Sequence, residues 1–307
     1  MQDITIESFG PIKTVNISLS DITILNGRQS AGKSTIAKTI YFFRSVPETV
    51  FRSLAASEDP AQETNKEVVT VLRKHLMDIF GTTKHMADFR LEFTYAPGKV
   101  VTVTRENQSG HARIKLSDNL RNGVFAIAQR LQAFHDDSRS HENSRDFATI
   151  QAERFRFLNQ IKREIYLLFE ESRTPVFIPA GRSLVTTLSG ELKDIDSWHM
   201  DGLIKDFVQR IYHQRSTFSK SLDELVEDRK RLSAAKIDFQ RVKKATELIK
   251  RIIQGQYRYS RHGEEQLFID DETYVKIMFS SSGQQEALWI ALLLFTLILD
   301  NEPTFCV

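Results

Sequence analysis

Hydrophobic and polar positions alternate in short runs at the start of the chain. Residues 3–8 and 13–19 carry apolar side chains at every second position, on either side of a Phe-Gly-Pro turn at 9–11. Such alternation is typical of half-buried strands, so the two runs predict a β-hairpin. A third run, 21–26 (DITILN), is β-branched and ends abruptly at Gly27, which predicts a short buried strand.

Helical spacing begins after that glycine. Ile36, Ile40 and Phe43 recur at intervals of four and three residues within the segment 33–46, as they do on the buried face of a helix. Pro47 follows, and a proline in a helical pattern predicts that the helix ends there. The order is therefore strand, tight loop, helix.

The middle of the chain predicts a mixture of helices and strands. Helices are expected over 67–80, 119–134 and 147–169, and strands over 89–95, 100–105 and 112–116. The polar segment 135–146 (HDDSRSHENSRD) has no bulky apolar residue and is expected to form an exposed loop. Its two histidines lie near carboxylates, but their spacing matches no known metal-ligand pattern.

The second half predicts one strand, a long helical region and a set of short strands. Residues 174–180 (TPVFIPA) are typical of a buried strand. Residues 201–254 contain no proline, and Phe218, Leu222 and Leu225 share one helical face, so a long antiparallel helix pair or short coiled-coil arm is expected. Its bend is expected near Ala234-Ala235. Strands follow over 256–260, 266–269 and 274–278, before an apolar helix that starts near residue 283.

Composition narrows the class of protein. With 307 residues, of which 41% are hydrophobic, the chain has room for one large domain or two ordinary ones. One cysteine, Cys306, excludes a disulfide scaffold and a cysteine-rich zinc module. No secretory signal is visible, and the longest apolar run, 287–299, is shorter than the ~20 residues of a membrane span. A soluble, cytoplasmic protein without a membrane segment is expected.

Basic residues concentrate in the long helical region. The whole chain has a net charge of +2, whereas residues 201–251 hold 13 Lys and Arg against 8 Asp and Glu, a local excess of 5. Such a bias suits nucleic acid or an acidic partner, although a solvated helix face with mixed charges is the more ordinary interpretation.

The strongest chemical signal is a glycine-rich loop that matches G-x-x-x-x-G-K-[ST] at every fixed position. The loop consists of Gly27, Arg28, Gln29, Ser30, Ala31, Gly32, Lys33, Ser34 and Thr35. Glycines let the backbone N–H groups surround phosphates, and the following helix directs the positive end of its dipole at them. Lys33 is expected to bridge the β- and γ-phosphates, and the Ser34 hydroxyl to complete the shell of Mg²⁺. The predicted cofactors are therefore ATP and Mg²⁺. A GTPase is disfavoured, since no Asn-Lys-x-Asp guanine signature is present, and a compact small-molecule kinase is disfavoured by the long helical insertion.

A second candidate phosphate contact lies in the segment 280–286 (SSSGQQE), between a predicted strand and a predicted helix. Its small residues expose hydroxyl and N–H groups at a helix start, which suits an anion. The alternative is a serine-rich turn that only caps the helix.

This second motif resembles the signature motif of the ATP-binding-cassette (ABC) superfamily, in the form seen in the SMC, RecF and OLD-like branch. The opening strands around 9–12, the early nucleotide loop and the long helical stretch between the motifs are consistent with that branch. Within it, the ATPase subunits of bacterial anti-phage systems (OLD-like, Septu-type and retron-associated) are most similar. The stretch 177–182 (FIPAGR) also resembles a sequence found in such proteins.

The resemblance implies an α/β P-loop NTPase fold of the ABC-ATPase head type, with an antiparallel β subdomain at the amino terminus and a long helical insertion. Two copies would form a homodimer around ATP, with Gly27–Thr35 of one copy holding the phosphates. Ser281, Ser282, Gly283 and Gln284 of the other copy would close over the γ-phosphate. DNA and an associated nuclease are the further partners that the resemblance implies, and no membrane is expected.

The expected division of the chain follows these motifs. Residues 1–46 would form the first strands and nucleotide loop, 47–173 a mixed β and helical lobe, 174–200 a head strand and loop, 201–254 the helical arm, and 255–307 the remaining, incomplete part of the head.

The superfamily also needs an apolar strand that ends in acidic residues, one to hold Mg²⁺ and a glutamate to activate water. In one placement, 297–299 is that strand and Asp300 and Glu302 are the acids. In the favoured placement, 283–299 is one helix and 304–307 begins the strand, so that the carboxylates are absent from the sequence. On the second placement no catalytic residue can be assigned, and we expect weak nucleotide binding and poor hydrolysis.

Two alternative functions follow from these motifs. The first is an ABC-type ATPase subunit in DNA metabolism or phage defence. The second is an inactive fragment or regulatory nucleotide-binding module.

Overall fold

The computed structural model describes residues 2–62, 64–106, 110–140, 146–180, 201–232, 237–260, 262–270 and 272–307. Within the chain, two compact units can be distinguished. Unit 1 comprises Met1–Pro175 together with Val307, and unit 2 comprises Val176–Cys306. Each unit is described by itself.

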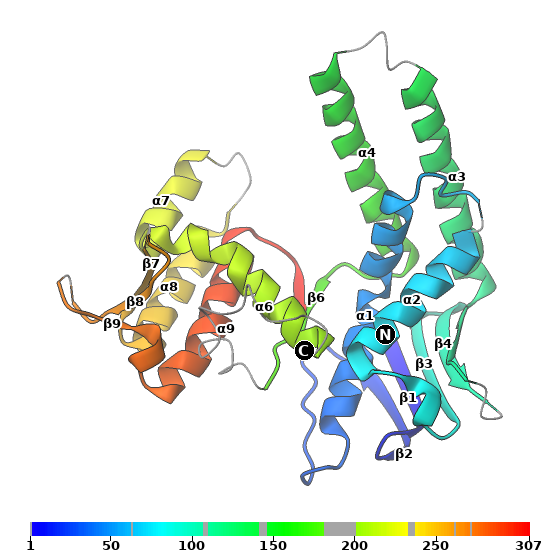
Figure 1. Cartoon of the computed structure of the whole chain (residues 1–307), viewed down its shortest axis with the longest axis horizontal. Helices are drawn as coiled ribbons and strands as arrows, with labels where there is room; N and C mark the ends of the chain where they lie inside the picture. Colours follow the sequence, from blue (N-terminus) through cyan, green and yellow to red (C-terminus); the bar gives the residue numbers. More distant parts are fainter. Residues whose placement is uncertain are drawn as a thin grey trace. The chain divides into compact units, whose positions relative to one another are not determined.

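An antiparallel sheet of five strands forms one side of unit 1, in the order β2-β1-β3-β4-β5 (Figure 1). The strands are β1 (Gln2–Phe9), β2 (Ile12–Leu19), β3 (Phe89–Ala96), β4 (Lys99–Arg105) and β5 (Arg113–Leu116). The hairpin at the start closes where Phe9 pairs with Ile12. Apolar side chains at alternate positions, such as Ile4 and Ile6, are fully buried. The predicted strands of this half, apart from 21–26, are thereby confirmed.

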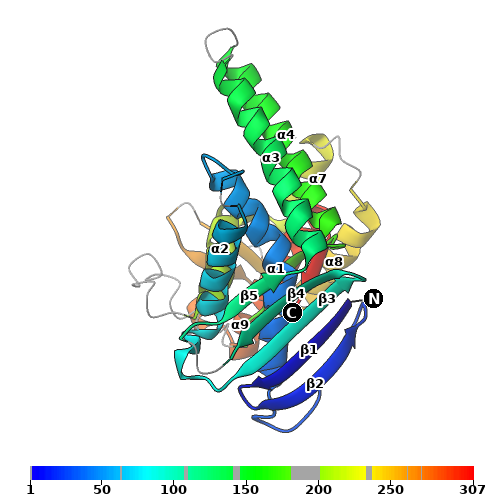
Figure 2. The ribbon, with the colours of Figure 1, turned by 90° about the vertical axis from the view of Figure 1, so that its right-hand side faces the viewer.

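The described residues of unit 1 also form four α-helices. They are α1 (Lys33–Ala56), α2 (Thr64–Phe80), α3 (Asp118–Ser140) and α4 (Phe147–Leu168), with a short 3₁₀ turn, η1 (Thr83–His85). α1 packs on the sheet, where the ring of Phe43 stacks on that of Phe93 with 5.3 Å between their centroids. α3 and α4 run side by side and extend beyond the sheet and α2 (Figure 2). The sheet and helices therefore share one core, which contains much of α1.

The expectation that α1 ends at Pro47 is wrong. The helix continues through Pro47 to Ala56. A proline in a helix leaves the carbonyl four residues earlier without its N–H partner, and here that carbonyl belongs to Phe43. The buried Tyr95 hydroxyl donates a hydrogen bond to it. Because a side chain from the sheet replaces the missing donor, the helix can continue.

The strand expected over 21–26 is not formed. This segment has no regular secondary structure, and the side chains of Ile22 and Ile24 are 81% and 84% exposed. β-branched residues favour extended backbone, but a strand also needs a neighbouring strand to satisfy its N–H and C=O groups. None of the strands in the described part of unit 1 pairs with this segment.

The polar segment after residue 134 is only partly a loop. α3 continues to Ser140, so the expected loop is helical over its first half. The rings of Phe134 on α3 and Phe157 on α4 stack with 4.1 Å between their centroids. This contact extends the pairing of the two helices into the polar region. Residues 141–145 lie outside the described residues.

Unit 2 consists of helices and a small antiparallel sheet of order β7-β8-β9. Its elements, as far as the described residues go, are α6 (Gly202–Gln214), η3 (Arg215–Ser219), α7 (Leu222–Leu232), α8 (Phe239–Ile253), β7 (Gln256–Tyr259), β8 (Glu265–Phe268), β9 (Tyr274–Lys276), η4 (Ile277–Phe279), α9 (Ser282–Leu299) and β10 (Thr304–Cys306). β10 pairs with β6 (Thr174–Val176), whose last residue begins the unit. β6 is shorter than the predicted strand 174–180, and residues 181–182 of the FIPAGR stretch lie outside the described residues.

The long helical arm expected over 201–254 is wrong. Among the described residues of this range, three separate α-helices form, α6, α7 and α8, and they pack around α9 (Figure 1). Phe207, Phe218 and Val242 are almost fully buried in the same cluster as Leu293 of α9. The apolar seam that suggested a coiled coil is therefore used for the core of unit 2. The bend expected at Ala234-Ala235 lies outside the described residues.

α9 is the most apolar helix of the described residues. Its 18 residues are long and apolar enough to cross a membrane by length and composition, but half of them are buried inside the protein. Trp289, Leu292 and Leu293 lie in the core of unit 2, which accounts for this composition. Since 297–299 is helical and Thr304–Cys306 is a strand, the structure agrees with the favoured placement of these segments and excludes a strand at 297–299.

Candidate nucleotide-binding site

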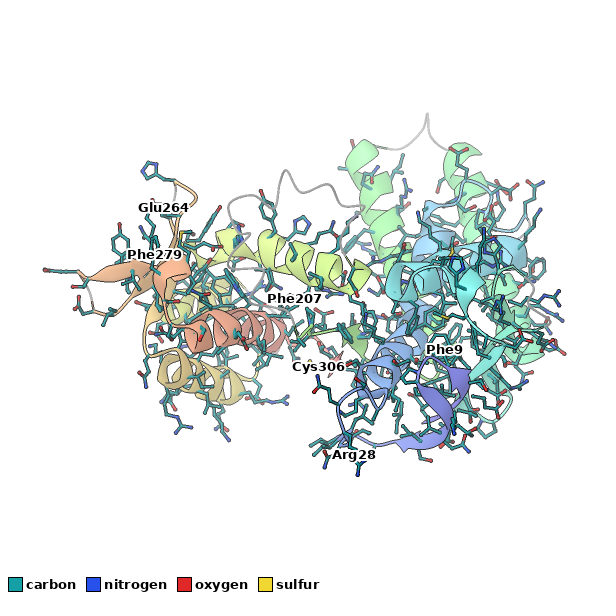
Figure 3. All side chains as sticks on the ribbon, turned by 60° about the horizontal axis from the view of Figure 1, so that its bottom comes forward. Phe9, Arg28, Phe207, Glu264, Phe279 and Cys306 are labelled. Carbon is teal, nitrogen blue, oxygen red and sulfur yellow. The ribbon has the colours of Figure 1, made fainter. Side chains whose placement is uncertain are left out.

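The glycine-rich loop links the irregular segment 21–26 to α1. α1 begins at Lys33, and Gly32 is its N-cap with a φ of 92°. Residues 28–31 are exposed, and Figure 3 shows Arg28 at the outer edge of this loop. Ser30 also has a positive φ, of 61°. The loop is thus an exposed turn that leads directly into a helix, as the motif predicts.

Gly32 is required by its surroundings as well as by its backbone angle. A Cβ atom at this position would lie 2.7 Å from Cγ1 of Ile12 and 3.2 Å from Cγ of Pro11. The turn of the first hairpin therefore packs directly against the loop at Gly32. Any larger residue at Gly32 would have to displace this turn or the loop.

The ammonium group of Lys33 lies over the loop. Its Nζ donates hydrogen bonds to the carbonyl oxygens of Gly27 (2.7 Å) and Arg28 (2.6 Å). The N–H of Gly27 in turn binds Oδ1 of Asn26 at 2.8 Å. A positive charge is therefore held at the mouth of the loop by neutral carbonyls, which leave it available to an anion.

The first turn of α1 suits a phosphate. The N–H of Ile36 donates to the carbonyl of Gly32 (2.9 Å), so the N–H groups of Lys33, Ser34 and Thr35 precede the helical hydrogen bonds. This turn has no acidic residue, and the Ser34 side chain is exposed. The donor set of N–H groups, an ammonium and a hydroxyl fits a triphosphate with Mg²⁺ on Ser34. The described residues contain no group of three or more metal-binding side chains that would complete an all-protein cation site.

The second predicted contact, Ser281 to Gln284, begins α9 in unit 2. Ser281 is the N-cap, and its Oγ accepts from the N–H of Gln284 (3.3 Å). Oε1 of Gln284 accepts from the N–H of Ser281 (3.1 Å), which completes a capping box. The capping role considered from the sequence is thus present. Ser282 and Gly283 are exposed, and a Cβ at Gly283 would meet nothing within 4 Å.

The side chain of Gln284 also forms a hydrogen bond to another helix of unit 2. Its Nε2 donates to the carbonyl of Ile253, the last residue of α8, at 2.8 Å. Met278 and Phe279, immediately before the turn, are 54% and 76% exposed; Figure 3 labels Phe279. Ser282 and Gly283 are therefore the residues of this motif that are open to a ligand.

The model of the AAA ATPase domain family matches residues 1–306. The chain belongs to this family. No curated protein matches the sequence.

Membership in the AAA ATPase domain family makes this a nucleotide-binding protein of the ATPase class with a P-loop NTPase fold. It also suggests a soluble protein that uses ATP with Mg²⁺. The mixed α/β structure with its antiparallel sheet agrees with this fold class. Among the described residues, Gly27–Thr35 is the segment whose loop geometry suits a nucleotide.

Sequence reasoning missed the side chains that anchor α1. Arg44 of α1 forms a 2.8 Å ion pair with Glu171, and both side chains are almost completely buried. Burial lowers the pKa of the Arg44 guanidinium, while the charge of Glu171 opposes this shift. Arg173 forms a 3.1 Å ion pair with Asp21, ahead of the nucleotide loop. These partners are far apart in the sequence, and no local pattern connects them.

Proposed function

We propose that this protein is an ATP-driven subunit in which two copies enclose nucleotide head to tail. Gly27–Thr35 of one copy would hold the phosphates, and Ser282 and Gly283 of the other would contact the γ-phosphate. The exposed Lys33 loop at the start of α1 carries this proposal. It is supported by the second exposed helix start at Ser282 and Gly283.

ATP is then the link between subunits. The triphosphate brings negative charge to two helix starts, and each supplies N–H groups and the positive end of a dipole. Hydrolysis removes the γ-phosphate and so removes the second contact. The dimer would open and close with the nucleotide state, which is how a small chemical change becomes a movement of whole subunits.

We further propose that the dimer acts on DNA, in an anti-phage system in which it controls a nuclease. This part rests on the resemblance of 280–286 to the SMC, RecF and OLD-like signature and on the basic residues between 201 and 251. The binding of duplex DNA at low salt is its first requirement, because phosphate contacts are strongest there.

The dimer is tested by light scattering of the full chain with and without ATP and Mg²⁺. Lys33→Ala and Ser282→Glu should each abolish the ATP-dependent doubling of mass, whereas Lys13→Ala, an exposed lysine of β2, should not. Ser282→Glu leaves the capping box intact. A carboxylate near a helix N-terminus also stabilises the helix, so the isolated subunit should stay folded. Loss of the dimer would therefore come from repulsion of the γ-phosphate and not from unfolding.

A mixture of the two variants tests the head-to-tail arrangement. A mixed dimer has one site with both Lys33 and Ser282 intact, so mixing should restore part of the ATP-dependent mass increase. A dimer that survives in Lys33→Ala, or no recovery on mixing, would contradict the proposal. Turnover measured in the same samples separates the two functions: Lys33-dependent hydrolysis supports an ATPase, and ATP-dependent dimerisation without turnover supports a regulatory nucleotide-binding module.

A further inference from the structure

One exposed face of α8 carries basic side chains in line. Arg241, Lys244, Leu248 and Arg251, of which Leu248 is apolar and the other three are basic, follow at intervals of three, four and three residues, so they lie on one side of the helix. All four are exposed. We call these four residues the α8 stripe. Over the whole helix there are five basic residues and one acid, Glu247, which gives a net charge of +4.

The core of unit 2 does not require this charge. The other side of α8 supplies the packing, through the buried Val242, Ile249 and Ile253. Arg241 and Lys244 lie in the first half of the helix, where the dipole disfavours cations, so they do not stabilise the helix as Arg251 near its end does. Arg241 has a carboxylate of Asp238 at 4.0 Å, whereas Lys250, outside the stripe, has Asp223 at 2.5 Å.

The geometry of the stripe suits a linear polyanion. With a rise of about 1.5 Å per residue, Arg241 and Arg251 are about 15 Å apart along the helix. Phosphates follow one another along a duplex strand about every 3.4 Å of axis, so this length spans several of them. A membrane surface fits less well, because Val242, Ile249 and Ile253 of α8 are buried in the protein, and Leu248 and Ile252 are the exposed apolar side chains beside the basic residues. A protein partner fits less well too, because the stripe holds no aromatic anchor.

The stripe is also connected to the proposed γ-phosphate contact. The carbonyl that ends α8, on Ile253, accepts from Nε2 of Gln284, and Oε1 of the same amide holds the N–H of Ser281. A ligand that shifts α8 therefore acts on the start of α9 through one side chain. α8 and α9 also pack directly against each other in the core of unit 2.

We infer that the α8 stripe binds the phosphate backbone of duplex DNA, independently of sequence, and that this binding favours the ATP-dependent dimer through Gln284. The inference rests on the proposed function and specifies where DNA binds and what it regulates.

The test compares two triple charge reversals in the full chain. One variant carries Arg241→Glu, Lys244→Glu and Arg251→Glu. The matched control carries Arg154→Glu, Arg156→Glu and Arg163→Glu, three exposed arginines of α4 in unit 1. Binding to a short fluorescent duplex is followed by anisotropy over a series of salt concentrations. The α8 variant should bind at least about tenfold more weakly at low salt, with a salt slope smaller by roughly 0.9 for each lost phosphate contact. The α4 variant should match the wild type.

Several outcomes would overturn the inference: equal affinity of the α8 variant and the wild type, equal losses in both triple variants, or equal affinity of the wild type for polyglutamate of matched length. The last would identify an acidic protein as the partner. A variant with Arg241→Lys and Arg251→Lys keeps the charges and should retain binding, which separates loss of charge from misfolding. If the wild type binds no DNA at low salt, the proposed DNA role fails as well; if it binds and the α8 variant binds equally, only this inference fails.

The regulatory part has its own measurement. Addition of duplex should lower the ATP concentration that gives half-maximal dimer in the wild type and the α4 variant, and leave that of the α8 variant unchanged. The same concentration with and without duplex in the wild type would refute regulation while leaving the ATP-dependent dimer standing.

Discussion

The hydroxyl of Tyr95 donates its hydrogen bond to the carbonyl of Phe43, the acceptor that Pro47 leaves without a helical donor. Tyr95 is 2% exposed, and burial raises its pKa well above the ordinary value. The hydroxyl is therefore neutral and available as a donor over the whole physiological range. One contact from the sheet thus keeps α1, the helix that begins at the nucleotide loop, continuous.

This contact predicts a coupled pair of substitutions. Tyr95→Phe should lower the free energy of unfolding by about 1–3 kcal/mol, since a buried carbonyl loses its donor. In a Pro47→Ala background the same change should cost less, because the N–H of the new alanine can bind Phe43. Urea unfolding of the four proteins of the double-mutant cycle measures the difference. Equal costs in both backgrounds would show that Tyr95 does not substitute for the helical donor.

The glycines of the two candidate phosphate contacts should respond differently to alanine. Gly32→Ala forces a Cβ to within 2.7 Å of Ile12 at a φ of 92°, so it should destabilise unit 1 by about 2–4 kcal/mol and weaken ATP binding. Gly283→Ala meets open space in the first turn of α9 and should leave stability unchanged or slightly raised. Thermal unfolding and nucleotide titration of both variants check this contrast. A stable Gly32→Ala protein with normal ATP affinity would contradict the role given to the hairpin turn.

The carboxyl group of Glu48 should account for part of the loss of stability of the folded protein at acid pH. Burial alone would raise the pKa of this carboxyl, but hydrogen bonds and charges from Lys162 and Arg52 lower it below its ordinary value of 4.5. The stabilisation is therefore complete above about pH 4.5 and is lost as the pH falls through the lowered pKa. Glu48→Gln should cost about 2 kcal/mol at neutral pH and make acid unfolding less steep. Denaturant unfolding between pH 3 and 7 measures this, and an unchanged pH dependence would argue against it.

Because Arg44 and Glu171 form a buried ion pair, replacing one of them should destabilise the protein more than replacing both. Glu171→Leu leaves a buried guanidinium without its carboxylate and should cost about 3–5 kcal/mol. Arg44→Met with Glu171→Leu should recover much of that loss. Glu171 also accepts from the N–H groups of Ser172 and Arg173, so recovery should be incomplete. A double variant no more stable than Glu171→Leu would contradict this account.

Local patterns predicted those elements whose residues carry the necessary information themselves. The alternation of apolar and polar residues on either side of a Gly-Pro turn predicted the hairpin at 2–19. The glycine before Lys33 predicted the start of α1. The capping box of α9 is similarly local, because Ser281 and Gln284 are three residues apart. Such features depend on backbone angles and near neighbours, which a short window of sequence specifies.

Contacts between distant residues reversed the other expectations. Pro47 marks a helix end by every local rule, yet Tyr95 supplies the missing donor and α1 continues. The apolar residues of 201–254 have the spacing of a coiled coil, but they are buried against α9 in the core of unit 2.

The sequence by itself determined the candidate nucleotide loop at Gly27–Thr35, because phosphate binding needs small residues, a lysine and a helix start in one continuous stretch. The tertiary structure decided that the turn of the first hairpin contacts Gly32 of that loop, and that Arg44 of α1 pairs with the distant Glu171. It also decided that Gln284 joins α8 to α9. Such contacts depend on which distant segments fold against each other, and the free energy of burial that selects them is a property of the whole core.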